Sequence, residues 1–151
     1  MHIEIDQSNK IENTGKDTII GLSTNCKLCT ILIPRHIKRK LQEEFRHQGK
    51  PRLFIYRTFI AGVVLLLAYS SIKLSKNDII QIDIEYSGKE LMLTSMFLEM
   101  FSRLFSFTPQ IQFKNIGKKS LAHQISYMTS TNRKKPNRII TYGEIGRLAL
   151  K

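Results

Sequence analysis

Three short apolar runs follow one another in the first 33 residues, before any helical pattern begins. The first alternates Ile3 and Ile5 with polar residues, and the next two, residues 18–23 and 29–33, are rich in β-branched side chains. Turn residues at 13–16 separate the first two runs, which predicts a β-hairpin, and Pro34 ends the third. A chain that begins in this way is expected to build a sheet whose first three strands are antiparallel.

Helical and extended patterns alternate through the rest of the chain. Residues 34–47 predict a short amphipathic helix, and residues 52–73 a buried helix, with a pair of strands as the alternative for the second segment. Residues 78–85 alternate apolar and polar side chains and give the clearest strand. After them we expect a helix to about residue 105, a strand at 110–114, a helix at 121–128 capped by Ser120, and a surface loop at 129–137. A short strand at 138–140 and a helix to residue 150, opened by a capping box of Thr141 and Glu144, complete the order.

This order predicts a single domain over residues 1–151 with an α/β fold. Its sheet should be mixed, opening with three antiparallel strands, and the helices should pack on it. A chain of 151 residues is long enough to bury a core without disulfides or structural metals.

The N-terminal segment and the cysteines favour a cytoplasmic protein. The first ten residues lack the basic and apolar regions of a signal peptide. The most apolar run, residues 59–69, is about half as long as the roughly 20 residues that cross a bilayer, so we expect a core helix and no membrane partner. Cys26 and Cys29 are too few for a disulfide framework, and no second pair of ligands accompanies them for zinc, so they are interpreted as small apolar residues beside a strand.

Charge gives the strongest indication of a partner. Lys and Arg number 24 against 12 Asp and Glu, a formal net charge of +12. Such a surface favours DNA or RNA, because basic side chains that contact phosphates release condensed counterions. A generally basic protein without such a partner is the alternative. The candidate phosphate contacts lie in three clusters: Arg35, Lys38 and Arg39; Lys118 and Lys119; and Arg133, Lys134, Lys135 and Arg138.

Acidic residues mark two of the predicted strands. Strand alternation puts Glu4 and Asp6 on one face of the first strand, and Asp83 and Glu85 on one face of the fourth. If these strands are neighbours, up to four carboxylates converge, and Mg²⁺ or Mn²⁺ prefers such oxygen ligands. His123 lies one turn into a later helix and is a further catalytic candidate. Solvated charges on strand faces are the alternative interpretation.

The order of elements and the strand acids resemble the ribonuclease H-like superfamily. Its members open with three antiparallel strands, carry a catalytic Asp in the first strand and an acid at the end of the fourth, and cut phosphodiesters with paired divalent metals. The resemblance covers most of the chain by its order of elements, and it implies that Asp6 is the catalytic acid of the first strand and Asp83 or Glu85 that of the fourth. The chain also departs from this family, which usually adds acids from helices: residues 52–73 contain no Asp or Glu, and His123 stands where an acid is expected.

Two hypotheses follow for the function. The first is a nuclease that hydrolyses phosphodiesters with Mg²⁺ or Mn²⁺ held by Asp6, Asp83 and Glu85, while His123 positions water or phosphate. The second is a non-catalytic DNA- or RNA-binding module, or a ribonucleoprotein-associated one, with a degenerate site. The patterns do not favour DNA over RNA or one oligomeric state over another.

Overall fold

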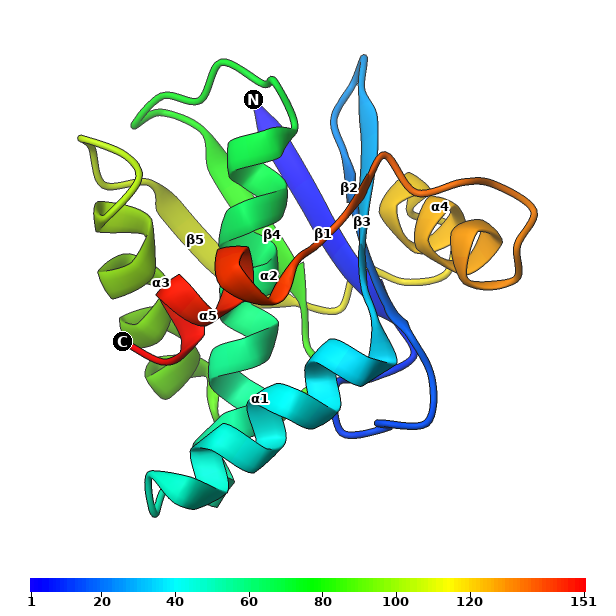
Figure 1. Ribbon diagram of the computed structural model, residues 1–151. Coiled ribbons are helices and arrows are strands. Elements are labelled where there is room, and N and C mark those ends of the chain that lie inside the picture. The colour runs from blue at the N-terminus through cyan, green and yellow to red at the C-terminus, as the bar shows by residue number, and fades with distance from the viewer.

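A six-stranded mixed sheet forms the centre of the computed structural model, which describes residues 1–151 (Figure 1). The strand order across the sheet is β5-β4-β1-β2-β3-β6. The strands are β1 (His2–Ser8), β2 (Thr18–Ser23), β3 (Leu28–Ile33), β4 (Ile79–Asp83), β5 (Gln110–Lys114) and β6 (Arg138–Ile139).

Strand directions divide the sheet into two parts. The first three strands are antiparallel, as the β1–β2 and β2–β3 pairings require. Strand β4 pairs parallel to β1, β5 parallel to β4, and the short β6 parallel to β3. The predicted α/β class, with a mixed sheet that opens on three antiparallel strands, is therefore confirmed.

Helices lie on both faces of this sheet, and their distribution is unequal (Figure 1). Helix α2 packs on β2 and β3 and is in turn contacted by α1, α3 and α5, whereas α4 packs on β1, β2 and β3 through the opposite face. The helices are α1 (Arg35–His47), α2 (Phe54–Tyr69), α3 (Glu90–Ser102), α4 (Leu121–Ser130) and α5 (Tyr142–Ala149), and a short 3-10 turn, Pro51–Leu53, precedes α2.

The main core lies between α2 and the apolar face of the sheet. Ile3 and Ile5 of β1 and Ile80 and Ile82 of β4 are buried there, as strand alternation predicts. Gly62 lets α2 approach closely, because a Cβ at this position would lie 2.6 Å from Cδ1 of Ile20. By length and composition the helical stretch Pro51–Tyr69 could cross a membrane, but 61% of it is buried inside the protein. It forms the expected core helix.

On the other face, α4 sits directly on the backbone of β2. A Cβ on Gly21 would lie 2.9 Å from the backbone oxygen of Ala122 and 3.1 Å from Cβ of Ser126. The absence of a side chain at Gly21 therefore allows the helix to lie this low. Ser120 caps α4 as predicted, since its side chain accepts a hydrogen bond from the Ala122 amide.

Element boundaries differ from the sequence prediction in a few places. The strand pair considered for residues 52–73 is wrong, because burial against the sheet on one side and α3 and α5 on the other suits a helix. Strand β4 ends at Asp83, so Glu85 lies beyond it, and α3 ends at Ser102 instead of residue 105. Helix α4 continues to Ser130, so Thr129 and Ser130 are not in the surface loop. The capping box of Thr141 and Glu144 is present.

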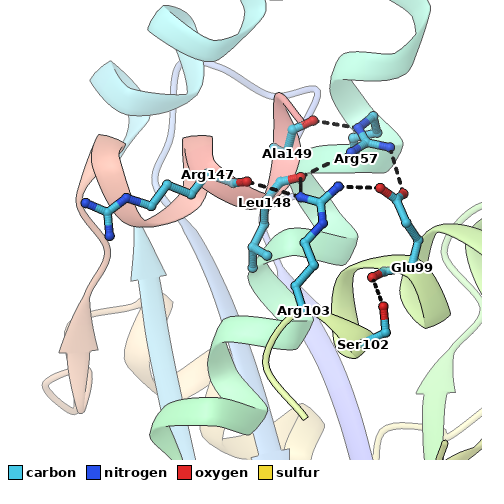
Figure 2. Close-up of polar contacts among 7 residues, drawn as sticks. All are labelled: Arg57, Glu99, Ser102, Arg103, Arg147, Leu148 and Ala149. Atoms are coloured by element: carbon cyan, nitrogen blue, oxygen red, sulfur yellow. Dashed lines mark hydrogen bonds and ion pairs between the residues drawn. The ribbon is translucent and has the colours of Figure 1, made fainter. Parts of the chain in front are cut away.

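Two arginines fasten the C-terminal helix α5 to α2 and α3 (Figure 2). Arg57 donates through Nε to the Ala149 carbonyl at 2.5 Å, and Arg103 donates through Nη1 to the Arg147 carbonyl at 3.1 Å. Glu99 of α3 pairs with both guanidinium groups. These donors satisfy carbonyls that a helix end leaves without partners. The two ion pairs also hold the Glu99 carboxylate of α3 on the side of the sheet opposite α4.

The contact between α4 and Gly21 predicts the effect of a single methyl group. Gly21→Ala should displace α4 and lower the free energy of unfolding by about 1–3 kcal/mol, since backbone cannot move aside as a side chain can. Gly143→Ala is the matched control, because a Cβ there meets nothing within 4 Å. Urea denaturation of the two variants measures the difference, and equal stabilities would contradict the close approach.

Candidate metal centre

Three carboxylates meet where β1 and β4 end. The two strands pair in parallel with Glu4 opposite Gln81 and Ile5 opposite Ile82, so Asp6 and Asp83 are the next residues along each strand. Glu85 reaches the same point from just beyond β4. Oxygen atoms of Asp6, Asp83 and Glu85 all lie within 4.8 Å of one another. The adjacency of these two strands, on which the sequence hypothesis depended, is therefore present.

Hydrogen bonds hold two of these carboxylates in place. Asp6 is buried, and its Oδ1 accepts from the Gln7 amide at 2.8 Å. Its Oδ2 lies 2.7 Å from Nδ1 of His123 on α4. Oδ1 of Asp83 accepts from the Ile116 amide at 2.9 Å, which ties the loop between β5 and α4 to the end of β4. Segments from four parts of the chain thus converge on this cluster.

Glu85 experiences the electrostatic cost of this arrangement. Its burial, together with hydrogen bonding and charge repulsion from Asp6 and Asp83, raises the pKa of Glu85 to about 8. Near neutral pH the Glu85 carboxyl therefore retains a proton that it would lose in an unfolded chain. A cation among the three groups would favour the ionised form and displace this proton.

Glu4 of β1, the remaining one of the four acids that the sequence placed on these strands, is not part of the cluster. Its Oε1 accepts a hydrogen bond from the Ser120 hydroxyl at 2.9 Å, at the start of α4. Three of the four carboxylates considered from the sequence therefore converge, and Glu4 supports the helix that carries His123. No helix contributes a carboxylate to the cluster.

His123 gives the cluster a titratable group that also reaches solvent. Its side chain is 36% exposed, whereas that of Asp6 is 5% exposed. With Nδ1 on Asp6, the opposite ring nitrogen Nε2 points away from that carboxylate. This pairing fixes the ring orientation, as carboxylates do for histidines in many active sites and metal sites.

Gln7 and Tyr86 also support the site, although no sequence motif singles them out. Each directly follows a cluster acid, and Gln7 Nε2 donates to the Tyr86 hydroxyl at 3.3 Å. That hydroxyl donates in turn to Glu12 Oε1 at 3.1 Å. Burial raises the pKa of Tyr86, so the phenol stays protonated as a donor. The pair thus links the chain just after Asp6 to the chain just after Glu85.

The predicted phosphate contacts fall into different environments. Lys118 and Lys119 are exposed in the loop that leads into α4, and Arg133, Lys134 and Lys135 are exposed in the loop that follows it. Arg35 pairs with Asp17, and Arg39 Nε donates to the Thr14 carbonyl at 3.0 Å, so both also hold the β1–β2 turn. Arg138 is paired with Glu144 at 2.8 Å and lies over the Tyr69 ring.

The interpretation of Lys38 as a surface phosphate contact is wrong. This lysine is fully buried, and its Nζ donates to the Asn13 carbonyl at 2.7 Å and to the Thr18 hydroxyl at 2.9 Å. Burial lowers the pKa of Lys38 to about 8, although the nearby Asp17 and Glu12 raise it. On the helix, position 38 follows buried Ile37 and faces the β1–β2 turn, which leaves its ammonium no path to solvent.

The cysteine pair contributes no metal site. Cys29 is buried in β3 and Cys26 is exposed in the preceding turn, and both are free. Neither belongs to the group of side chains that could hold an ion.

Comparisons of this chain with models of protein families, with curated proteins and with solved structures find no match.

Replacing the buried ammonium of Lys38 tests its structural role. Lys38→Met should lower the free energy of unfolding by about 1–3 kcal/mol, because the Asn13 carbonyl and the Thr18 hydroxyl lose their donor. Lys40→Met, on the exposed side of the same helix, is the control and should cost less. Thermal denaturation measures both variants. A Lys38→Met protein as stable as wild type, but weaker on nucleic acid, would restore the original interpretation.

The raised pKa of Glu85 predicts a pH-dependent stability. The unfolded chain releases this proton near pH 4.5 and the folded chain near pH 8, so the group makes folding less favourable as pH rises between these values. In chelator, Glu85→Gln should melt about 3–6 °C above wild type at pH 8, after allowance for partial exposure, and close to it at pH 5. Differential scanning calorimetry at both values checks this. A difference that does not change with pH would mean that Glu85 is ionised throughout.

Proposed function

We propose that this chain is a divalent-metal-dependent nuclease with a ribonuclease H-like fold, which hydrolyses phosphodiester bonds in DNA or RNA. The observation that carries the proposal is the meeting of Asp6, Asp83 and Glu85 within 4.8 Å at the ends of two adjacent parallel strands. Three carboxylates so close together are costly without a cation, which favours a functional reason for the arrangement.

The sheet supports the fold part of the proposal. Its strands run β3-β2-β1-β4-β5, with three antiparallel strands followed by two parallel ones, and β6 adds a short edge beside β3. The ribonuclease H-like resemblance implies an Asp in the first strand and an acid at the end of the fourth. Asp6 and Asp83 match these positions and lie side by side on the adjacent strands β1 and β4.

The donor set suits a hard cation. Asp6, Asp83 and Glu85 would hold Mg²⁺ or Mn²⁺ through carboxylate oxygens. Burial, together with the neighbouring Asp6 and Asp83, raises the pKa of Glu85 to about 8. Such an ion, when bound, stabilises charge on phosphate oxygens and lowers the pKa of a bound water molecule. The partial exposure of Asp83 and Glu85 leaves the cluster open to a substrate.

Ribonuclease H-like nucleases usually have a further acid on their last helix. In the proposed site, His123 of α4 takes the place of that acid. Asp6 holds its Nδ1, so Nε2 is available to position a water molecule or to accept or donate a proton at a phosphate oxygen. A neutral or positively charged imidazole also repels the substrate less than a fourth carboxylate would. We assign His123 the general acid–base or positioning role.

Exposed lysines and arginines in the loops before and after α4 would bind the substrate. Lys118 and Lys119 precede the helix, and Arg133, Lys134 and Lys135 follow it. Contacts of this kind position a nucleic acid through its phosphates and carry no sequence information. The affinity that these contacts give weakens as the salt concentration rises. In this proposal the basic side chains hold the phosphates of the substrate while the carboxylate cluster acts on one phosphodiester.

Loss of one carboxylate separates the metal site from the binding surface. Asp6→Asn should reduce Mn²⁺-dependent cleavage of labelled single strands and duplexes at least about 100-fold, because the change removes a metal ligand and the partner of His123. Binding in chelator should stay equal or tighten, since a negative charge near phosphate is lost. Glu4→Gln is the control, because Glu4 shares the strand and face of Asp6 but lies outside the cluster.

The result also distinguishes the second candidate function. If the wild-type chain binds nucleic acid and Mn²⁺ but cuts no strand, it is a non-catalytic module with a degenerate site. If Asp6→Asn cleaves as fast as Glu4→Gln, the carboxylate cluster is not the catalytic centre.

A further inference from the structure

A polar cavity of about 390 Å³ lies beside the carboxylate cluster, between the last turn of α4, the β1–β2 turn and the start of α1. Only three of its 12 lining residues are hydrophobic. A cavity of this size and polarity suits a small polar ligand or one unit of a polymer. The lining residues used below are Ser8, Lys16, Asp17, Arg35, Tyr127 and Ser130.

Two elements run from the carboxylate cluster into this cavity. Ser8 follows Asp6 by two residues on the same face of β1, about 6.7 Å farther along the strand. Tyr127 follows His123 by one turn on the same face of α4. The helix is fastened to the strand at both levels, by His123 to Asp6 at 2.7 Å and by Ser130 to Ser8 at 2.8 Å. The cavity therefore begins two residues beyond Asp6 along β1 and one turn beyond His123 along α4.

Tyr127 is the one aromatic residue that lines this cavity. The residue is 51% exposed, and its ring stacks on no other aromatic residue of the protein. Other tyrosines are engaged by the fold: Tyr86 packs against Phe59, and Tyr69 carries Arg138 on its face. An exposed ring next to a nucleic-acid site is a platform on which a base can stack.

The charge of the cavity suits an anion. Lys16 and Arg35 contribute two positive charges and Asp17 one negative charge. Asp17 is engaged by Arg35, whose backbone amide donates to Oδ1 at 2.8 Å and whose Nε lies 3.8 Å from the same atom. Lys16 is exposed and keeps its charge free for a ligand. Ser8 and Ser130 also line the cavity, where the Ser8 hydroxyl donates to the Ser130 hydroxyl at 2.8 Å and the Ser130 hydroxyl donates to the Tyr127 carbonyl at 2.8 Å.

We propose that this cavity binds the nucleotide next to the phosphodiester that is cut, with its base stacked on Tyr127 and its phosphate near Lys16 and Arg35. The inference rests on the proposed nuclease function and adds a requirement to it. A base can reach the Tyr127 ring only when it is unpaired, so the bound strand is single-stranded or locally opened at this nucleotide.

Binding of a fluorescent single strand of about 12 nucleotides, measured by anisotropy in chelator, tests the proposal. Tyr127→Ala should weaken the affinity about 5- to 150-fold, because stacking of one base is lost. Tyr127→Phe should retain the affinity, since the ring remains. Leu121→Ala is the matched control, because Leu121 lies on the same helix and is also 51% exposed but does not line the cavity.

Lys16→Glu provides a second variant, at an exposed position whose side chain makes no hydrogen bond or ion pair within the protein. It should weaken the same strand more than Lys76→Glu, a charge reversal of equal size in the loop before β4. Equal affinities of wild type, Tyr127→Ala and Leu121→Ala would overturn the nucleotide site and leave the nuclease proposal intact, because cleavage and Asp6 are tested separately. Tyr127-dependent binding without Mn²⁺-dependent cleavage would support the nucleotide site and remove the nuclease. A wild-type chain that binds no strand would overturn both.

Discussion

The parallel pairing of β1 with β4 is the constraint on which the candidate site depends. It sets Ile5 opposite Ile82, so the acids that follow, Asp6 and Asp83, end side by side. Their repulsion is opposed by the hydrogen bonds that the Gln7 and Ile116 amides donate to them and by the apolar packing of the same strands on the other face. Because a strand alternates its side chains, one pairing builds the core below and the acidic cluster above.

Helix α4 converts this cluster into a site with an accessible titratable group. It lies low on the sheet because Gly21 has no side chain, and it is tied to β1 at three levels by Ser120, His123 and Ser130. The other four helices lie on the opposite side of the sheet, where α2 packs on the strands and α1, α3 and α5 contact α2. The main core therefore lies on one face of the sheet, and the acidic cluster with His123 lies on the other.

The basic residues of this protein fall into two groups, those that bind turns and helix ends of the fold and those that are exposed in loops. Lys38, Arg35 and Arg39 of α1 bind groups of the β1–β2 turn and so hold the hairpin that carries Asp6. Arg57 and Arg103 fasten the C-terminal helix in a similar way (Figure 2). Basic residues in the loops before and after α4 are instead exposed. The net charge of +12 thus overstates the surface available for a polyanion, because part of it stabilises turns and helix ends.

Local patterns in the sequence determined the elements: the alternation of isoleucines marks β1 and β4, Ser120 marks the start of α4, and Thr141 with Glu144 marks α5. They also placed Asp6 and Asp83 on defined strand faces, because side-chain direction in a strand follows from position alone. Only the tertiary structure decided that Glu85 joins these acids while Glu4 bonds to Ser120, that Lys38 is buried, and that Tyr127 stands beside a cavity. Each of these depends on which distant segment packs against the residue, and the pattern of side chains within one segment does not contain that information.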